Sequence, residues 1–382
     1  MLNIGSVFSG IGAFEHALNR VGVPHKIVFA CDIDAFVKQS YFANYEIVEE
    51  EWYSDIHNID GKKYLKKIDI LVGGSPCQSF SLVGKRKGFD DSRGLLVFEF
   101  ARLLKEIQPK CFIFENVKGL LSNDEGKTWE LVKESFVNSG YNIFFKVLNA
   151  KDYGIPQNRE RLFVVGFKEI DSFEFPAPIE LVTTMQDFLQ DNINSKYFLP
   201  KKGIEFVTKI KNLEKRYTQI NGEIALCQKA NQQFNWHGDF IFDQAQDIPE
   251  KYYLSDKVKE YVLATGTKKF YSKPQTDLEI ARPLVSSMHK MHRAGVDNYV
   301  TKQGRLRKLT PRECLRLMGF GDDFKQIVSD TQMYRQAGNS IVVNVLIHIL
   351  KQIFSSCSFQ PNIHTQKSKK NVKQSFEQPI SK

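Results

Sequence analysis

The chain has 382 residues, 42% hydrophobic and 25% charged, as is ordinary for soluble globular proteins, and it can bury a large core. Fifty-three lysines and arginines against 44 aspartates and glutamates give a net charge of +9, which suits a polyanionic partner. No uninterrupted apolar stretch approaches the ~20 residues of a membrane span, and the N-terminus lacks the pattern of a signal peptide. The six cysteines are scattered without a CxxC pair, which argues against a disulfide framework or a zinc site. We therefore expect a soluble, cytoplasmic protein without a membrane anchor or a metal centre.

Short apolar runs alternate with helical patterns along the first half of the chain. The predicted strands are residues 2–8, 26–31, 68–72, 111–114, 146–149 and 162–167. Helices are predicted from the glycine turn at 9–12 to Val21, over 35–43, and where Leu96, Phe100, Leu103 and Ile107 recur at helical spacing. The alternation predicts an α/β fold with a doubly wound, mainly parallel sheet covered by helices on both faces. Such sheets bind ligands beyond the carboxyl ends of their strands.

The alternation stops after about residue 172, and Pro176 and Pro178 mark a boundary. The following hundred or so residues are rich in Asn, Gln, Lys and Tyr, which predicts a smaller, irregular domain. A helix is predicted again from Thr310, with Pro311 at its first position. We therefore divide the chain into a first domain (1–175), a second domain (176–281), a return to the first domain (282–355) and a basic tail (356–382) predicted to be disordered.

A glycine turn and two acidic residues follow the first predicted strands. Phe8-Ser9-Gly10-Ile11-Gly12 would let a ligand approach the backbone at a helix N-terminus, although a plain structural turn is the alternative. Asp32 ends the second strand, where nucleoside-binding sheets bind ribose hydroxyls. Asp55 could accept a hydrogen bond from the amino group of a base, or it could simply be an exposed carboxylate.

Cys77 stands alone among polar, turn-forming residues in GGSPCQSFS (73–81), unlike Cys111 and Cys314, which read as buried hydrophobes. The loop 78–94 contains three glycines and the basic run Lys85-Arg86-Lys87, which suits closure over a phosphate backbone. No histidine lies nearby in the sequence to form a protease-like pair, so the thiol would attack a target that is itself electrophilic.

Two further clusters carry charged residues at the ends of predicted strands. Glu115, after the apolar run CFIF, would have a raised pKa in a half-buried site and could hold and donate a proton; the alternative is a helix-capping role. In an extended segment Gln157, Arg159 and Arg161 would point to one side and form a clamp for an anion or a base edge. The alternative for these arginines is a solvated edge strand.

In their order and spacing, these clusters resemble the cytosine-carbon-5 DNA methyltransferases of bacterial restriction–modification systems. The motifs that carry the resemblance are FSGIG (8–12), PCQSFS (76–81), GFDDSRG (88–94), ENV (115–117), QNRER (157–161) and AGNSIVVNV (337–345). RPLVSSMH (282–289) and RKLTPRECLRLMGF (307–320) fall where another of the family's blocks lies, so the resemblance covers roughly 3–167 and 280–350. It implies the S-adenosylmethionine-dependent methyltransferase fold, with a target-recognition domain at 176–281.

The resemblance also implies a mechanism. Cys77 would add as a thiolate to carbon 6 of a cytosine flipped out of the DNA stack. Glu115 would hold the exocyclic amine and the protonated ring nitrogen, while Arg161, and less directly Arg159, would support the base and Glu115. Carbon 5 would then take a methyl group from S-adenosylmethionine, and loss of its proton would release the enzyme.

For the cofactor, the resemblance assigns eleven residues: Phe8, Ser9, Gly10, Ile11, Gly12, Asp32, Ile33, Asp55, Ile56, Asn339 and Ser340. Phe8 and Ile56 would contact adenine, Asp55 its amine, and Asp32 the ribose. The sequence departs from the family's pattern at two positions: Ile33 stands where a tryptophan is frequent, and Asp32 stands where a glutamate is common. Both changes bear on cofactor affinity more than on activity.

The DNA contacts are expected from the loop after Cys77 and from the second domain. The loop candidates are Gln78, Ser81, Lys85, Arg86 and Lys87. The candidates in the second domain, for base or phosphate contacts, are Arg216, Asn231, Gln232, Gln233, Asn235, Lys268 and Lys269. We expect a monomer that acts on double-stranded DNA, with a cognate restriction endonuclease as a functional partner.

Three alternatives remain at this stage. A transfer-RNA cytosine-5 methyltransferase would share the catalytic motifs, but the segment of about 100 residues at 176–281 favours DNA. A catalytically inactive DNA-binding relative is disfavoured by the intact Cys77, Glu115 and Arg161. An amino-group methyltransferase would need a (D/N)PP(Y/F) motif, which the sequence lacks.

Overall fold

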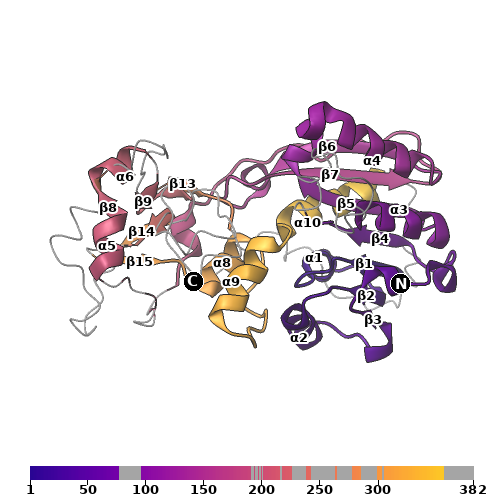
Figure 1. The fold of residues 1–382 in the computed structure, drawn as a ribbon, viewed down its shortest axis with the longest axis horizontal. Helices are drawn as coiled ribbons and strands as arrows, with labels where there is room; N and C mark the ends of the chain where they lie inside the picture. The colour runs from indigo at the N-terminus through magenta and orange to yellow at the C-terminus, as the bar shows by residue number, and fades with distance from the viewer. Residues whose placement is uncertain are drawn as a thin grey trace, which may run out of the picture.

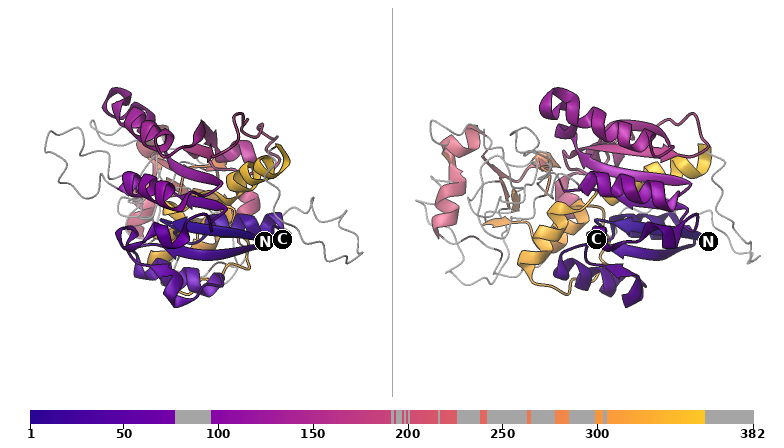
Figure 2. Two further views of the ribbon diagram at one scale, coloured as in Figure 1. Left: turned by 90° about the vertical axis from the view of Figure 1, so that its right-hand side faces the viewer. Right: turned by 45° about the vertical axis from the view of Figure 1, so that its right-hand side comes forward.

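The computed structural model consists of a larger lobe and a smaller lobe, with two helices between them (Figures 1 and 2). It describes residues 1–76, 96–190, 193, 197, 199, 201–215, 217–225, 238–241, 263–264, 278–284, 299–302 and 305–356. The larger lobe holds a seven-stranded sheet, whose strands all lie within residues 2–167, and the helix that ends the described chain.

The sheet of the larger lobe has the strand order β3-β2-β1-β4-β5-β7-β6. Its strands, in that order, are Trp52–Tyr53, His25–Cys31, Leu2–Val7, Ile70–Gly73, Cys111–Val117, Glu160–Phe167 and Asn142–Asn149. The first five are parallel, whereas β7 runs antiparallel to β5 and β6 antiparallel to β7. The predicted α/β class and mainly parallel sheet are confirmed, although the two-residue edge strand β3 was not foreseen.

Helices cover both faces of this sheet, because buried apolar residues lie on both sides of its central strands. Ile70 and Val72 of β4 belong to one buried cluster with α1 and α10, whereas Leu71 belongs to the other with α3. The helices of the larger lobe are α1 (Ala13–Val21), α2 (Ala35–Asn44), α3 (Leu96–Ile107), α4 (Lys127–Val137) and α10 (Val343–Ser356). Short 3-10 turns lie at Glu49–Glu51, Ile56–Asn58, Gly61–Tyr64, Lys118–Gly126, Ala150–Tyr153 and Met185–Phe188, of which the last is η7. Gly22 ends α1 in the left-handed conformation at φ 75°, as predicted.

The smaller lobe is built from short elements around a small core. They are α5 (Lys201–Val207), β8 (Thr208–Lys209), α6 (Ile210–Glu214), β9 (Thr218–Ile220), β10 (Glu223–Ala225), β11 (Gly238–Phe240), β12 (Leu263–Ala264), β13 (Leu278–Ala281), β14 (Tyr299–Lys302) and β15 (Arg305–Lys308). The antiparallel pair β14–β15 lies beside β9 and β11 (Figure 1). This lobe therefore draws on residues beyond 281, where the sequence division had placed the return to the first domain.

Two helices between the lobes, α8 (Pro311–Leu317) and α9 (Asp330–Asn339), continue the chain towards α10. The stretch 330–355 is long and apolar enough by composition to cross a membrane, which the sequence reading overlooked. Its most apolar 18-residue window is 61% buried inside the molecule, so it is a core element of a soluble protein. The last described residue, Ser356, belongs to α10, and the predicted tail beyond it lies outside the described residues.

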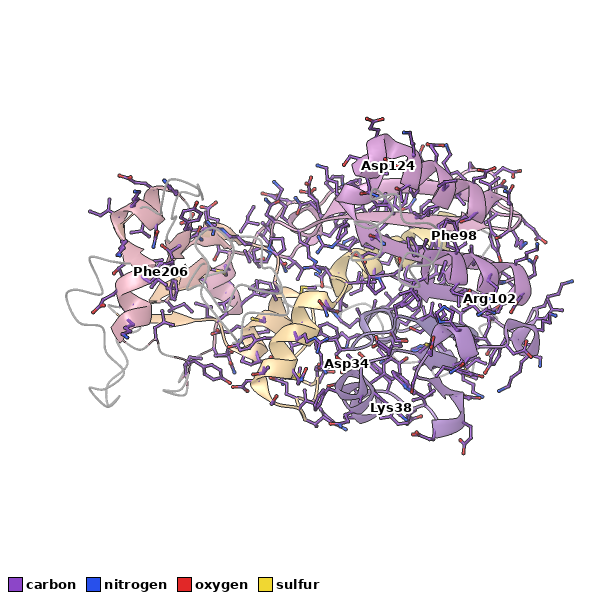
Figure 3. The ribbon with its side chains drawn as sticks, in the orientation of Figure 1. Asp34, Lys38, Phe98, Arg102, Asp124 and Phe206 are labelled. Atoms are coloured by element: carbon purple, nitrogen blue, oxygen red, sulfur yellow. The ribbon has the colours of Figure 1, made fainter. Side chains whose placement is uncertain are left out.

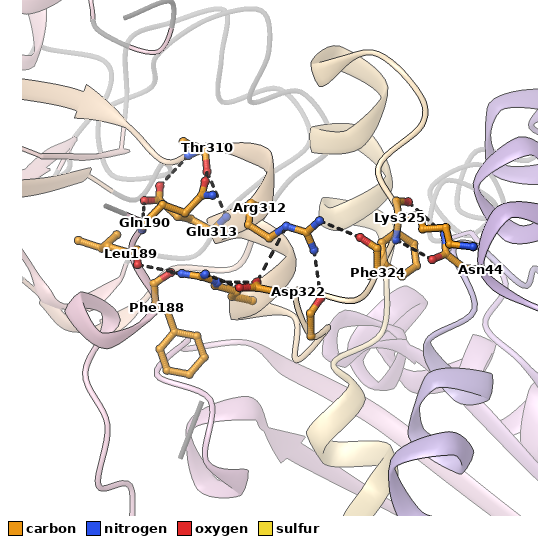
Figure 4. Close-up of polar contacts among 12 residues, drawn as sticks. Asn44, Phe188, Leu189, Gln190, Thr310, Arg312, Glu313, Asp322, Phe324 and Lys325 are labelled. Carbon is orange, nitrogen blue, oxygen red and sulfur yellow. Dashed lines mark hydrogen bonds and ion pairs between the residues drawn. The ribbon is translucent and has the colours of Figure 1, made fainter. Parts of the chain in front are cut away.

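The start of α8 holds the segment that leads into the smaller lobe (Figure 4). Thr310 and Glu313 form the predicted cap as a reciprocal capping box, and Glu313 Oε1 also accepts the backbone N–H of Gln190 at 2.7 Å. Arg316 donates to the carbonyl of Leu189 at 2.8 Å. The polar groups of α8 therefore fix the direction in which the chain leaves the larger lobe.

Candidate active site

The turn after β1 brings Phe8 and Gly10 to the carboxyl end of the sheet. Both residues have left-handed backbone conformations, at φ 52° and 53°. Ser9 ties the turn to β2, because its hydroxyl donates to the carbonyls of Ser6 and Cys31, each at 3.1 Å. Among the described residues, a Cβ added to Gly10 would meet only the carbonyl oxygen of Phe8, at 4.0 Å, so this part of the structure leaves open space beside the backbone. This opening suits the close approach of a ligand.

The carboxylate of Asp32 closes one side of this opening. Its Oδ2 accepts the backbone N–H of Gly10 at 3.0 Å, and its Oδ1 accepts that of Asp34, also at 3.0 Å. Burial raises the pKa of Asp32, and these two hydrogen bonds oppose the rise. A partly buried carboxylate of this kind can still accept hydrogen bonds from hydroxyl groups of a ligand.

The other glycine and the isoleucine of the turn face the interior. Gly12 is required by packing, because a Cβ there would overlap the ring of Tyr45, whose hydroxyl donates to the Gly12 carbonyl at 2.7 Å. The side chain of Ile11 is fully buried in the core. Packing against Tyr45 is therefore sufficient reason for glycine at position 12, whereas close approach of a ligand stays a prediction for Gly10.

The remaining predicted cofactor residues differ in exposure. Ile33 is 84% exposed, whereas Ile56 is buried in the core cluster with α3. Asp55 caps its own turn, and its hydrogen bonds from the backbone N–H and the ring of His57 lower its pKa. Asn339 is exposed and Ser340 buried, at the end of α9.

An ion pair links α9 to the residues after β2. Arg335 lies 3.4 Å from the carboxylate of Asp34. Asp34, which is labelled in Figure 3, also caps α2 by accepting from the backbone N–H of Phe36. The segment that ends in Asn339 and Ser340 is thus held near Asp32.

Glu115 and Arg161 form an ion pair on neighbouring strands, with 3.2 Å between Arg161 Nε and Glu115 Oε1. Arg161 lies opposite Val117 in the β5–β7 register, and Val117 and Glu115 are on the same face, so the pair is diagonal across the two strands. Burial raises the pKa of Glu115, while the charges of Arg161 and Arg159 oppose the rise. Protonation of this carboxyl group is thus easier than that of a glutamate in water, which is the direction that the sequence predicted.

Gly74 and Ser75, which shortly precede Cys77, pack against Glu115 and Asn116 of β5. The sequence analysis assigned these two residues no role. A Cβ added to Gly74 would lie 3.0 Å from Glu115 Oε2, so glycine leaves room for the carboxylate. Ser75 is bound to the buried Asn116, whose Nδ2 donates to the Ser75 carbonyl at 3.1 Å. An asparagine inside an otherwise apolar strand was the signal available in the sequence.

Arg159 and Gln157 do not join Arg161 in one clamp. The strand β7 begins at Glu160, so the extended geometry expected for 157–161 is wrong for these two side chains. Both are buried and bind backbone groups of distant segments. The positive charge of Arg159 nevertheless lowers the pKa of Glu115.

Several predicted residues lie outside the described residues: Cys77, Gln78, Ser81, Lys85, Arg86, Lys87, Arg216, Asn231, Gln232, Gln233, Asn235, Lys268 and Lys269. In the part of the chain that is described, no three His, Cys, Asp or Glu side chains are grouped so that they could hold a metal ion. Cys31, Cys111 and Cys314 are buried thiols, which agrees with the interpretation of Cys111 and Cys314 as buried hydrophobic residues.

Comparison with known proteins identifies close relatives over almost the whole chain. The type II methyltransferase M.HhaI of Haemophilus parahaemolyticus is 33% identical over 358 residues, covering 93% of this chain and 95% of that protein. The orphan methyltransferase M.SPRI of Bacillus phage SPR is 31% identical over 427 residues, covering 92% of this chain and 97% of that protein.

Solved structures agree on the fold. The S. pombe Dnmt2 methyltransferase matches with a TM-score of 0.65 at 20% identity, over 94% of this chain and all of that chain. The Entamoeba histolytica methyltransferase EhMeth matches with a TM-score of 0.61 at 19% identity, over 93% and 98%. The family model for C-5 cytosine-specific DNA methylases, whose members use S-adenosylmethionine as methyl donor, matches residues 2–355. The chain therefore belongs to the C-5 cytosine-specific DNA methylase family and is a DNA cytosine-5 methyltransferase, as the sequence motifs had indicated.

Proposed function

We propose that the protein methylates carbon 5 of a flipped-out cytosine within a specific double-stranded DNA site, through a covalent adduct with Cys77. The single observation that carries this proposal is the Glu115–Arg161 pair, with its 3.2 Å separation and the raised pKa of the Glu115 carboxyl. Gly74 and Ser75, which contact Glu115 and Asn116, immediately precede Pro76-Cys77 in the chain. Cys77, the proposed nucleophile, thus closely follows residues 74–75, which lie beside the Glu115 carboxyl group.

In this mechanism the chain's own residues activate the base. Protonated Glu115 donates to the ring nitrogen of cytosine, which makes carbon 6 electrophilic. The Cys77 thiolate forms a bond to carbon 6, and the electron pair of the carbon 5–carbon 6 bond moves towards carbon 5. After methylation, a base removes the carbon 5 proton and the sulfur leaves carbon 6, so the double bond re-forms. Arg161 holds Glu115 in place throughout.

S-adenosylmethionine, when bound, supplies an electrophilic methyl group. The residues present fit its adenosine part: the opening beside Gly10 admits a ligand, and Asp32 presents a partly buried carboxylate to hydroxyl groups. Phe8 and the residues Asn339 and Ser340 would complete the pocket. Asp55 and Ile56 stay candidates for the adenine contact, and Ile33 is exposed enough to cover a bound ring.

We further propose that residues 176–281 select the DNA sequence and that the loop residues Gln78, Ser81, Lys85, Arg86 and Lys87 contact the DNA. The net charge of +9 supports binding of a polyanion. Relatives named type II methyltransferases support a role in protecting host DNA beside a restriction endonuclease. We further propose that the protein acts in the cytoplasm and as a monomer.

Covalent trapping tests this function. A duplex with 5-fluorocytosine at the methylated position, located by bisulfite sequencing of plasmid from expressing cells, blocks the loss of the carbon 5 substituent. The enzyme should then remain attached in a denaturing gel, and only when S-adenosylmethionine is present. A transfer RNA carrying 5-fluorocytosine, tested in parallel, should give no band.

Two variants control the trapping experiment. Cys77→Ser should give no adduct, because an alkoxide forms far less readily than a thiolate near neutral pH. Glu115→Gln should form the adduct at least ~100-fold more slowly, because proton donation to the ring is lost. An active wild-type enzyme that leaves no stable band would overturn the covalent mechanism.

A further inference from the structure

Both backbone polar groups of Leu284 are bound by side chains of the QNRER motif. The N–H of Leu284 donates to Gln157 Oε1 at 2.9 Å, and its carbonyl accepts from Arg159 Nη1 at 3.0 Å. Leu284, Gln157 and Arg159 are all buried. These two side chains and Leu284 are called the Leu284 clasp below.

The clasp also holds the end of α9. Arg159 Nη2 donates to the carbonyls of Gly338 at 3.2 Å and Ser340 at 2.9 Å. One guanidinium therefore bridges two segments that are far apart in the chain, and Asn339, a proposed cofactor contact, stands between the two carbonyls it binds.

On its other side the clasp reaches the smaller lobe and α8. Gln157 pairs with Ala281, the last residue of β13, and its Nε2 donates to the Leu317 carbonyl at 2.7 Å. The strand β13 pairs in turn with β10 in the smaller lobe. The clasp thus lies at the end of β13, a strand of the smaller lobe, where that strand meets residues 157–159 of the larger lobe.

Because the clasp is buried, separating its segments has a large free-energy cost. If the segment at Leu284 shifted away from Arg159, several buried donors and acceptors would lose their partners, and each unpaired group costs its full desolvation penalty. The segment at 281–284 and the segment at 338–340 are therefore stable in one mutual position. A ligand that orders either segment favours the same position of the other.

We propose that the Leu284 clasp couples DNA binding at the smaller lobe to cofactor binding at the end of α9, with Arg159 as its positioning residue. This inference rests on the proposed function, since it takes 338–340 as part of the cofactor pocket and the smaller lobe as the DNA reader. Because coupling between two binding sites is reciprocal, DNA raises cofactor affinity by the same factor as cofactor raises DNA affinity.

Titration calorimetry of S-adenosylhomocysteine, with and without duplex carrying the site found by bisulfite sequencing, measures the coupling. For the wild type we expect the duplex to tighten binding ~10-fold, within the usual range for coupled sites. Arg159→Lys keeps the charge near Glu115 but lacks the two separate nitrogens with which the guanidinium reaches Leu284 on one side and residues 338–340 on the other, so its factor should fall below ~3-fold.

Arg312→Lys is the matched control, because Arg312 also donates to two backbone carbonyls, those of Gly321 and Phe324, away from the clasp. It should keep the ~10-fold factor. If circular dichroism shows that Arg159→Lys does not fold, Gln157→Met removes the contacts to Leu284 and Leu317 instead and should lower the factor likewise.

The outcomes separate the two proposals. A wild type that binds no S-adenosylhomocysteine and methylates no DNA refutes the proposed function. A wild type that is active but shows no coupling, a folded Arg159→Lys variant that keeps the wild-type factor, or an Arg312→Lys variant that loses it equally overturns the role of the clasp.

Discussion

Asp32 holds the local backbone in place and also presents its carboxylate to the opening beside Gly10. Its two oxygens fix the turn at Gly10 and the start of the segment that leads to α2, while its carboxylate stays at the opening where a ligand can approach. Because burial raises its pKa, the ionised form is kept only at a cost, and a ligand's hydroxyl groups would offset that cost.

Replacing Asp32 by alanine should weaken S-adenosylmethionine binding. The loss of a charged acceptor predicts ~1–3 kcal/mol, or about 5- to 150-fold in affinity. Titration calorimetry measures this directly, with Asp60→Ala as control, since Asp60 caps a distant 3-10 turn in the same manner. Equal affinities of Asp32→Ala and wild type would remove Asp32 from the pocket.

Glu15 predicts a pH dependence of stability. It is fully buried on α1; Oε1 accepts the Tyr41 hydroxyl at 2.6 Å, and in the described part of the chain Oε2 has no hydrogen-bond partner. Burial raises its pKa, so its favourable contribution is present below the ordinary pKa of a glutamate and is lost as pH rises through the raised value.

Glu15→Gln should therefore gain stability relative to wild type as pH rises from about 4 to about 8. Thermal melts at several pH values measure the difference. Glu130→Gln, at an exposed glutamate on α4, controls for the substitution itself. A difference for Glu15→Gln that stays constant with pH, or shrinks as pH rises, contradicts the assignment.

At the scale of elements, the contribution of α8 to stability comes from its capping box and its hydrogen bonds to neighbouring segments. With seven residues it is too short to be stable alone, and it depends on its capping box and on tertiary contacts. Through Glu313 and Arg316 it holds the chain at Leu189 and Gln190, close to where the smaller lobe begins. Loss of the cap should therefore lower the stability of the whole fold.

Thr310→Ala should lower the free energy of unfolding by ~1 kcal/mol. The loss is up to ~2 kcal/mol if the hydrogen bond from the Thr310 hydroxyl to Gln190 Oε1 also contributes. Urea unfolding gives the value. Ser329, the N-cap of α9, makes no side-chain capping hydrogen bond, so Ser329→Ala should change stability far less. Equal losses in the two variants would show that the capping box contributes nothing specific.

At the scale of the whole molecule, the larger lobe presents its candidate site at the carboxyl edge of the sheet. Phe8, Asp32 and Glu115 follow or end strands there. The net charge of +9 predicts that DNA binding weakens steeply with salt. The size of this salt dependence counts the lysines and arginines that contact DNA phosphates and displace their counterions.

Replacing Lys85, Arg86 and Lys87 together by alanine should reduce the slope of log affinity against log salt by about 2.7, from ~0.9 for each phosphate contact. The control replaces three exposed lysines, Lys62 and Lys63 in the 3-10 turn Gly61–Tyr64 and Lys105 in α3, and should leave the slope nearly unchanged. Fluorescence binding at several salt concentrations gives both slopes. Matching slopes in wild type and the loop variant would mean that the loop does not contact phosphates.

The sequence by itself determined the features that depend on neighbouring residues. The apolar alternation predicted six of the seven strands of the sheet and the helices α1, α2 and α3, but not β3 or α4. Gly22 predicted the end of α1, and Thr310 with Glu313 predicted the start of α8. The ordered motifs identified the family. These signals are local, since a cap or a buried strand is encoded within a few consecutive residues.

Only the tertiary structure decided how distant residues meet. It placed β7 between β5 and β6, which brings Arg161 to Glu115, and it turned Arg159 towards carbonyls that lie 125 to 181 residues further along the chain. It also showed that Gly12 is needed for Tyr45 and Gly74 for Glu115. Such pairings depend on strand order, register and the packing of whole elements, so no short stretch of sequence encodes them.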